Sequence, residues 1–236
     1  MIELKDITKI YGGKVKALDN VTLSVPDGCI YGFLGPNGAG KTTAIKLITG
    51  IIKQDSGSVK VGGEEAMSLE SKKNIGFVPD DPNIFLRLKG IEYLSFMADM
   101  YDVDSQDRQS RIKELSERFE LSKALSDKIQ SYSHGMRQKI VLMGALIHQP
   151  KVWILDEPMT GLDPKSSFEL KKMMREHADK GNTVFFSTHV LDVAEKVCDK
   201  LAVINEGRIL FAGDLGDLKK SSSASLEKMF LEMTDA

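Results

Sequence analysis

The segment from Gly35 to Thr42 contains the residue types that hold phosphate groups. It reads Gly35-Pro36-Asn37-Gly38-Ala39-Gly40-Lys41-Thr42 and fits the pattern G-x-x-x-x-G-K-[ST] at every fixed position. Glycines let the backbone wrap closely around phosphates, and a helix that starts at Thr42 adds the positive end of its dipole. We expect Lys41 to reach the β- and γ-phosphates of a nucleotide and Thr42 to offer its hydroxyl to Mg²⁺. The predicted nucleotide contacts are Gly35, Asn37, Gly38, Ala39, Gly40, Lys41, Thr42 and Thr43.

Two adjacent carboxylates, Asp156 and Glu157, follow the apolar run Val152–Leu155. Four consecutive apolar residues indicate a buried strand, and α/β sheets bind ligands at the carboxyl ends of their strands. Asp156 suits Mg²⁺, reached through water, and Glu157 suits orienting or deprotonating the attacking water. In isolation such a pair is commonly a solvated strand end. Together with the phosphate loop it predicts nucleotide hydrolysis.

A third polar strand end contains His189. It closes the segment Ser187-Thr188-His189, which follows the apolar strand pattern Thr183–Phe186. A single histidine is more often structural than catalytic, but the end of a strand on this edge of the sheet places it near the γ-phosphate. We therefore predict that Lys41, Glu157 and His189 are the catalytic residues.

Alternating strand and helix patterns surround these motifs. Strand patterns cover Ile2–Ile7, Val21–Val25, Cys29–Leu34, Ser58–Val61, Asn74–Val78, Val152–Leu155, Thr183–Ser187 and Lys200–Ile204, and helix patterns cover Thr42–Ile48, Ser166–Ala178 and Val190–Val197. From about Pro82 to Ile147 the pattern is helical throughout. Such alternation favours a parallel sheet with helices on both faces, interrupted here by a helical insertion. A short tail helix, Leu226–Leu231, is predicted after the serines Ser221–Ser223, although any amphipathic terminal helix gives the same pattern.

The composition is that of an ordinary globular chain. Among the 236 residues 28% are charged, the formal net charge is −2 and the pI is about 6.1, so nothing favours nucleic acid as the main partner. The apolar runs fall short of the roughly 20 residues that span a bilayer, and the first residues do not have the pattern of a secretory signal. We therefore expect a cytoplasmic location. Cys29 and Cys198 are predicted to be buried thiols.

Four further segments make the chain similar to the ATPase subunits of ABC transporters. Ser131–Lys139, with the sequence SYSHGMRQK, stands where the family signature, usually LSGGQ, is expected. Thr160–Pro164 follows Glu157 as the family's D-loop does, Val78–Asp80 stands at the Q-loop, and Tyr11 takes the place of an aromatic residue that stacks on adenine. The resemblance extends from about Tyr11 to residue 213.

The resemblance implies roles for residues outside the phosphate loop. Tyr11 and Asp163 would contact the nucleotide, and Ser133 and Gly135 would hold the γ-phosphate bound by the other subunit. The start of a predicted helix, Met136–Ile147, is suited to bind an anion. Catalysis would then be shared between two copies.

Several positions depart from the family pattern. In the signature, Tyr132 replaces leucine, His134 replaces the first glycine and Met136 replaces glutamine, while Ser133 and Gly135 remain. Asp80 replaces the Q-loop glutamine. We predict that Asp80 reaches Mg²⁺ through water, joining Thr42 and Asp156 as a metal residue; the alternative is a turn residue between two prolines. These departures, and the tail, resemble the drug- and peptide-exporter branch.

These features together predict one ATP-binding domain over residues 1–236 with an α/β phosphate-loop core. The predicted parts are an N-terminal antiparallel β region and core (about 1–80 and 150–213), an inserted helical subdomain (about 82–148) and a tail helix (about 214–236). The expected function is MgATP hydrolysis by a head-to-tail pair, formed with a second copy or a paralogue. The pair would power transport, in the export direction, through a separate membrane permease at the inner face of the cell membrane.

Two other functions share parts of this pattern. A soluble ABC ATPase acting on ribosomes or DNA shares the motifs, but chromosome-type relatives carry a long coiled coil before the signature and translation-type relatives carry two such domains. A small-molecule kinase gives no reason for the signature segment.

Overall fold

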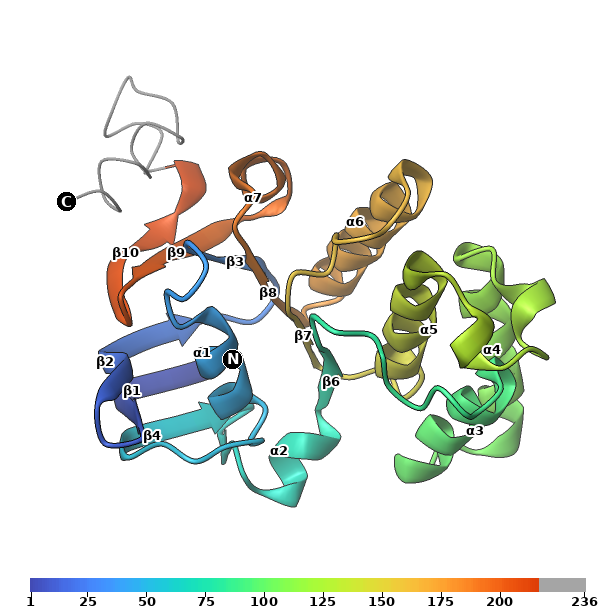
Figure 1. Ribbon diagram of the computed structural model, residues 1–236, viewed down its shortest axis with the longest axis horizontal. Helices are drawn as coiled ribbons and strands as arrows, with labels where there is room; N and C mark the ends of the chain where they lie inside the picture. Colours follow the sequence, from blue (N-terminus) through green and yellow to red (C-terminus); the bar gives the residue numbers. More distant parts are fainter. Residues whose placement is uncertain (217–236) are drawn as a thin grey trace.

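The computed structural model describes residues 1–216, which form two β-sheets and the helices that pack around them (Figure 1). The strands are β1 Ile2–Tyr11, β2 Val15–Val25, β3 Ile30–Leu34, β4 Ser56–Val61, β5 Glu64–Glu65, β6 Ile75–Val78, β7 Val152–Leu155, β8 Thr183–Thr188, β9 Lys200–Asn205 and β10 Arg208–Asp214. The α-helices are α1 Lys41–Ile48, α2 Leu69–Lys73, α3 Gly90–Met100, α4 Ser105–Arg118, α5 His134–Leu146, α6 Pro164–Asp179 and α7 Leu191–Val197. Two short 3₁₀ helices, η1 Ser122–Ala124 and η2 Ile129–Ser131, lie between α4 and α5.

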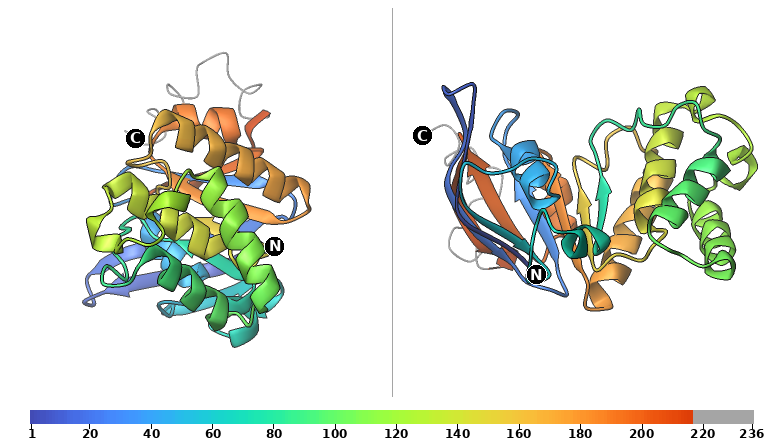
Figure 2. Two further views of the ribbon diagram at one scale, coloured as in Figure 1. Left: turned by 90° about the vertical axis from the view of Figure 1, so that its right-hand side faces the viewer. Right: turned by 90° about the horizontal axis from the view of Figure 1, so that it is seen from below.

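The first sheet is antiparallel, as predicted for the N-terminal region. Its strand order is β2-β1-β4-β5, and β1 pairs antiparallel with both β2 and β4. Ile2, Leu4 and Ile7 of β1 are buried and face the second sheet across α1, in a core that also contains residues of β3 and β8. Figure 2 shows α1 between the two sheets. The sheet therefore covers one face of the helix that follows the phosphate loop.

The second sheet has the order β10-β9-β3-β8-β7-β6 and contains the functional edge. Strands β9, β3, β8, β7 and β6 are parallel, and β10 pairs antiparallel with β9. In β8 the side chains alternate: Val184 and Phe186 belong to the core on the α6 and α7 side, whereas Phe185 belongs to the core against α1. Both faces are thus covered, as a parallel sheet requires.

The helices α3, α4 and α5, with η1 and η2, form the helical region (residues 90–146), inserted in sequence between β6 and β7. Its buried side chains, including Leu94, Phe119 and Leu142, belong to the same apolar core as Trp153 and Leu155 of β7. In Figure 1 this region lies at the right, away from the antiparallel sheet. The predicted α/β class with a helical insertion is confirmed.

Some boundaries differ from the sequence prediction. Strand β10 was not predicted, because none of its residues is buried and its apolar signal is weak. Helix α5 begins at His134 rather than Met136, since the Ser133 side chain caps it. The predicted tail helix Leu226–Leu231 lies outside the described residues. Cys29 and Cys198 are free and buried, as predicted. Within residues 1–216 no helix is both long enough and apolar enough to cross a membrane.

Candidate functional site

The phosphate loop connects the carboxyl end of β3 to α1, and two of its glycines are required by close packing. A Cβ atom on Gly35 would lie 2.4 Å from the Ile204 carbonyl oxygen, and one on Gly40 would lie 2.5 Å from that of Ala17. Gly40 also has φ +107°, which L side chains rarely adopt. The backbone of β2 and β9 therefore presses on the loop from outside and shapes it.

Lys41 lies at the base of this loop. Its side chain is 7% exposed, and Nζ donates hydrogen bonds to the carbonyl oxygens of Gly35 (2.7 Å) and Pro36 (3.2 Å). The ammonium group is also 3.5 Å from Glu157 Oε1. The loop thus surrounds the ammonium group of Lys41, the lysine that the phosphate-loop pattern requires, and holds it next to the predicted catalytic carboxylate of Glu157.

Asp156, at the end of β7, connects the start of α1 to the end of β8. Thr42 Oγ1 donates to Asp156 Oδ2 at 3.0 Å, and Ser187 Oγ donates to Asp156 Oδ1 at 2.5 Å. The three residues come from α1, the end of β7 and β8, which are neighbours at the carboxyl edge of the sheet. Asp156 is only 2% exposed, so this hydroxyl pair fixes its orientation.

The residues around Thr42 and Asp156 fit a magnesium ion. They offer hydroxyl and carboxylate oxygen, which Mg²⁺ prefers, and Mg²⁺ is usually held by one or two carboxylates together with substrate phosphates. Within residues 1–216 no group of three or more His, Cys, Asp and Glu side chains forms a metal site by itself. Phosphate oxygens would therefore have to complete the ligand set.

Glu157 follows Asp156 in a strained conformation. Its φ is +47°, outside the normal range for a residue with a side chain, and its backbone N–H donates to Ser187 Oγ at 3.0 Å. Glu157 Oε1 is 3.0 Å from His189 Nδ1, so the two predicted catalytic residues are in contact. Among the described residues this buried oxygen has no well-aligned hydrogen bond. It is an acceptor suited to a water molecule.

A cavity of about 340 Å³ lies in front of these groups. Besides the phosphate loop it is lined by Val15, Lys16, Ala17, Asp80, Glu157, Glu206 and Gly207. Partial burial, followed by the negative charges of Asp156 and Glu157, raises the pKa of Asp80. The negative charges of Asp156 and Glu157 thus disfavour the charged form of Asp80, and a divalent cation would offset this repulsion.

Tyr11 does not line this cavity. It lies at the end of β1, opposite Val15 in the hairpin, and is 42% exposed; the Lys9 ammonium is 5.7 Å from its ring centroid. The adenine-stacking role of Tyr11 remains a prediction.

Two parts of the site were not assigned from the sequence. Ser187 was quoted only as part of a motif, yet its hydroxyl binds both Asp156 and the Glu157 backbone. The β9–β10 turn, with Glu206 and Gly207, lines the cavity, and Gly207 N–H donates to the Ala39 carbonyl of the phosphate loop at 3.0 Å. The sequence Glu206-Gly207 is typical of a turn, but this signal does not indicate a place in the nucleotide site unless strand β10 is recognised after it.

The signature residues lie elsewhere, at the start of α5. Ser133 is exposed, and its Oγ accepts a hydrogen bond from Met136 N–H at 3.3 Å. A Cβ atom on Gly135 would lie 2.7 Å from the Gly161 carbonyl oxygen, so the signature packs on the D-loop. Neither Ser133 nor Gly135 lines the phosphate-loop cavity.

Asp163 of the D-loop caps α6. Its carboxylate accepts hydrogen bonds from Ser166 N–H (2.9 Å) and Ser166 Oγ (2.6 Å) and lies 3.0 Å from Lys139 Nζ on α5. The pKa of Asp163 is held well below its usual range. The hydrogen bond from the Ser166 hydroxyl contributes most, followed by the Ser166 backbone N–H and by Lys139. The predicted nucleotide contact of Asp163 remains a prediction.

Comparison with known proteins identifies the class. The family model of ABC transporters matches residues 18–160. The chain is 32% identical, over 92% of its length, to an uncharacterised ABC transporter ATP-binding protein of Synechocystis, and 33% identical, over 98%, to the daunorubicin/doxorubicin resistance ATP-binding protein of Streptomyces peucetius. It spans 64% and 70% of those two proteins.

Solved structures agree. A structure described as the ATP-binding subunit of an ABC transporter has a TM-score of 0.93 at 30% identity, with 99% of each chain covered. A dimeric ATP-binding cassette in a post-hydrolysis state, bound to ADP and phosphate, has a TM-score of 0.82 at 26% identity, covering 91% of this chain and 99% of that one. The chain belongs to the ABC transporter family and is an ATP-binding, ATP-hydrolysing cassette of that family.

Proposed function

We propose that residues 1–236 are one domain that binds MgATP, pairs head-to-tail with a second copy or a paralogue, and powers export through a separate membrane permease. The observation that carries this proposal is that Lys41, Thr42 and Glu157 line one cavity, with Asp156 bound to Thr42 behind them, whereas Ser133 lies outside it. One chain holds the phosphate cradle and the water-activating carboxylate. A second chain would contribute its signature.

The chemistry follows from the contacts. Lys41 would bind the β- and γ-phosphates, and Glu157 would orient a water and accept its proton while His189, 3.0 Å away, contacts the γ-phosphate. When bound between Thr42, Asp156 and the phosphates, Mg²⁺ supplies positive charge that neutralises the phosphate oxygens. Asp80 would reach this ion through water.

Pairing is supported by the exposed start of α5. The helix N-terminus at Ser133 has backbone N–H groups and a favourable dipole for an anion, yet this chain's own cavity is not lined by it. Similarity to a dimeric cassette supports a second copy as the source of that anion.

Export and membrane attachment are supported by the relatives, one of which is named for drug resistance. In this proposal a separate permease chain would hold the subunit at the inner face of the cell membrane. We place its docking surface around 80–88, where Phe85 is 46% exposed and packs on Tyr93 and Phe96.

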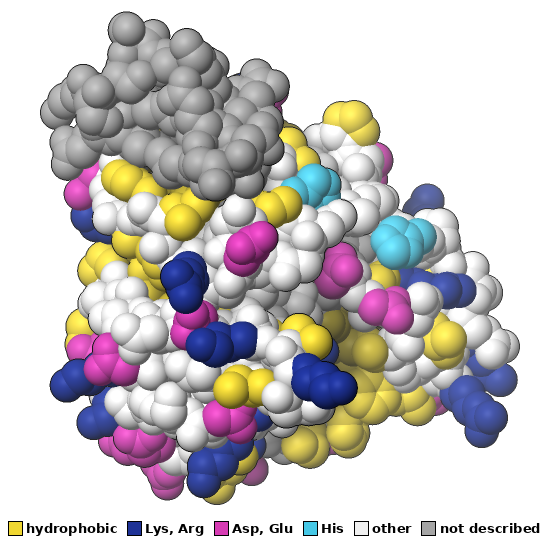
Figure 3. All heavy atoms as spheres, turned by 60° about the vertical axis from the view of Figure 1, so that its left-hand side comes forward, with side chains coloured by type: hydrophobic (Ala, Val, Ile, Leu, Met, Phe, Trp, Pro, Cys, Tyr) yellow, Lys and Arg dark blue, Asp and Glu magenta, His cyan; other side chains and the backbone are white. Residues whose placement is uncertain are grey.

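On the face shown in Figure 3, basic and acidic side chains are interspersed without a continuous basic patch, which gives no support to a nucleic-acid partner. The transporter names of the relatives also disfavour a soluble ribosome- or DNA-acting ATPase.

Glu157→Gln tests the proposal. The amide keeps the size of the side chain but cannot accept the proton from water, so kcat should fall by about 10²–10³-fold while ATP binding persists. With ATP, the variant should accumulate as a dimer in size-exclusion chromatography. Glu64→Gln, on the remote strand β5, is the matched control and should behave as the wild type. Near wild-type turnover by Glu157→Gln would show that Glu157 does not activate the water.

A further inference from the structure

Besides the apolar core that it shares with β7, the helical region contacts the rest of the protein at two places that bear on the position of the signature. At the nucleotide edge, α5 packs on the D-loop through Gly135 and Gly161 and through the Lys139–Asp163 ion pair. The second place joins the carboxyl end of α4 to α6 through Arg118. These two joints connect the helical region, which contains the signature, to the D-loop and to α6.

Arg118 binds two carboxylates on α6 with two edges of its guanidinium group. Its Nε donates to Glu169 Oε1 at 2.6 Å, and one terminal nitrogen donates to Glu176 Oε2 at 2.8 Å. Glu169 and Glu176 are seven residues apart, so they lie on the same face of α6, two turns from each other. The side chains of Arg118 and Glu169 are about four-fifths buried (22% and 21% exposed). Charge-assisted contacts of this kind are directional and stronger than neutral hydrogen bonds.

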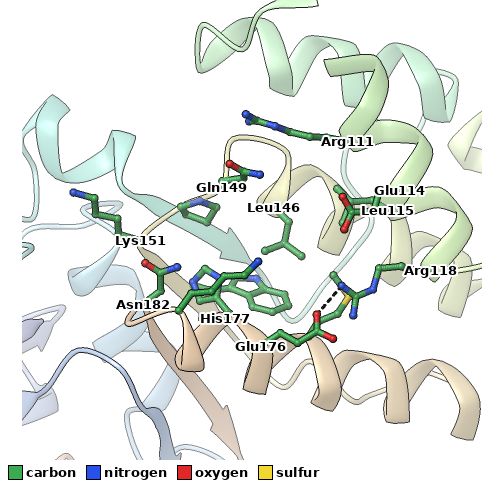
Figure 4. A pocket seen from close by; sticks show the side chains of 14 residues that line it. Arg111, Glu114, Leu115, Arg118, Leu146, Gln149, Lys151, Glu176, His177 and Asn182 are labelled. Atoms are coloured by element: carbon green, nitrogen blue, oxygen red, sulfur yellow. Dashed lines mark hydrogen bonds and ion pairs between the residues drawn. The ribbon is translucent and has the colours of Figure 1, made fainter. Parts of the chain in front are cut away.

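The space beside this joint is not filled by side chains. A cavity of about 390 Å³ lies between α4 and α6, with Leu115, Leu146, Trp153 and Met173 among its lining residues. Figure 4 shows Arg118 reaching Glu176 at one side of this cavity, with His177 near its floor. Close packing would fix the angle between two helices, whereas a cavity leaves room for them to move. Arg118 therefore bridges α4 and α6 beside a gap.

Each side of this bridge leads to a part of the catalytic machinery. After α4 the chain passes through η1, where Ser122 Oγ donates to Ser116 Oγ at 3.0 Å, and Tyr132 OH donates to the Ala124 carbonyl at 2.5 Å. Tyr132 is buried and directly precedes Ser133. On the other side, α6 begins at the D-loop cap Asp163. A rotation about this joint would thus move the signature relative to the core.

We propose that Arg118 is a positioning residue: by clamping α4 to Glu169 and Glu176 it sets the orientation of the helical region and, through it, the place of Ser133. The proposal rests on the proposed function, in which Ser133 serves the second subunit. Arg118, Glu169 and Glu176 do not line the phosphate-loop cavity, so the clamp acts through the position of the signature.

Arg118→Met is the first test, with Arg108→Met as the matched control. Arg108 pairs with Asp99, and both lie inside the helical region, so that control removes an α4 ion pair without touching the joint. For Arg118→Met we expect ATP affinity of the monomer within twofold of wild type, with kcat and ATP-dependent dimerisation lowered about tenfold. Arg118→Lys should recover part of the loss, because it keeps the charge but not the two-edged geometry. Loss of ATP binding in step with kcat would overturn the proposal.

Non-additivity and a distance measurement complete the test. Glu169→Gln with Glu176→Gln should reproduce the effect of Arg118→Met, and combining all three should add little, as for residues in one network.

A distance measurement tests the orientation of the helical region directly. Spin labels would be attached to cysteines substituted for the exposed Lys60 and Lys113, and the native Cys29 and Cys198 are buried and so protected from labelling. The distance distribution should broaden in Arg118→Met and in the double glutamine variant but not in Arg108→Met. An unchanged distribution would overturn the proposal. This readout uses the monomer, so it decides the question even if Glu157→Gln fails to dimerise and the proposed function falls.

Discussion

The phosphate loop and the signature segment each lead into a helix whose N-terminus can hold an anion, but their surroundings differ. At the start of α1 the same chain supplies Lys41, Thr42 and Glu157 to one cavity, and Asp156 is hydrogen-bonded to Thr42. At the start of α5, Ser133 is exposed, and the nearby cation Lys139 is paired with Asp163. The first site gathers its phosphate-binding groups within one chain, whereas the role that we propose for the second requires another chain. Substitutions at three positions test this difference.

Ser133→Arg should have the largest effect. A long cationic side chain at the exposed start of α5 would occupy the space where the phosphate of the opposing subunit has to approach, so hydrolysis should fall by about 100-fold or more. Binding of ATP to the monomer, measured by fluorescence titration, should stay unchanged because Ser133 does not line the phosphate-loop cavity. Ser110→Arg, on the exposed face of α4, controls for added charge. If Ser133→Arg loses monomer binding as well, the signature is not independent of the first site.

Gly135→Ala should have an intermediate effect. The new methyl group would lie 2.7 Å from the Gly161 carbonyl oxygen, so either the D-loop or α5 has to move. We expect about 1–3 kcal/mol loss of stability, as is typical of overpacking, and a several-fold lower kcat. Chemical denaturation and steady-state ATPase assays measure the two. Gly216→Ala places its methyl in open space and should change neither. If Gly135→Ala keeps the stability and the kcat of the wild type, the contact between the signature and the D-loop can rearrange without loss of free energy.

Asp80→Asn and Asp80→Ala should have the smallest effect. If Asp80 reaches Mg²⁺ through water, both should shift the half-saturating Mg²⁺ concentration of the ATPase upward by about two- to fivefold, because one attractive charge is lost. Unchanged metal dependence in both variants would leave Asp80 a turn residue.

The stability of the Asp80 variants gives a second readout. The pKa of Asp80 is raised by partial burial and by Asp156 and Glu157, so its charged form is disfavoured in the folded protein. Asp80→Asn should therefore be the more stable protein at neutral pH, and the difference should shrink as pH falls through the raised pKa of Asp80.

The sequence determined the parts of the protein whose patterns are local. Glycine spacing identified the phosphate loop, and apolar runs followed by polar ends identified β7 and β8 with Asp156, Glu157 and His189. Strand and helix periodicity gave the α/β class, because burial on both faces of a parallel sheet forces continuous apolar strands. The sequence also showed which positions depart from the family pattern, such as Asp80 and His134.

Tertiary structure alone decided which of these parts meet. Ser187 became part of the site because β8 lies beside β7, and Gly207 because β10, an edge strand with no buried residue, turns back along β9 over the phosphate loop. The contact of Gly135 with Gly161 and the bridge from Arg118 to Glu169 and Glu176 join segments about 26 to 58 residues apart. A side chain's type records its chemistry, but its partners depend on strand order and helix packing, which arise from the burial of the whole chain and leave no local pattern at either residue.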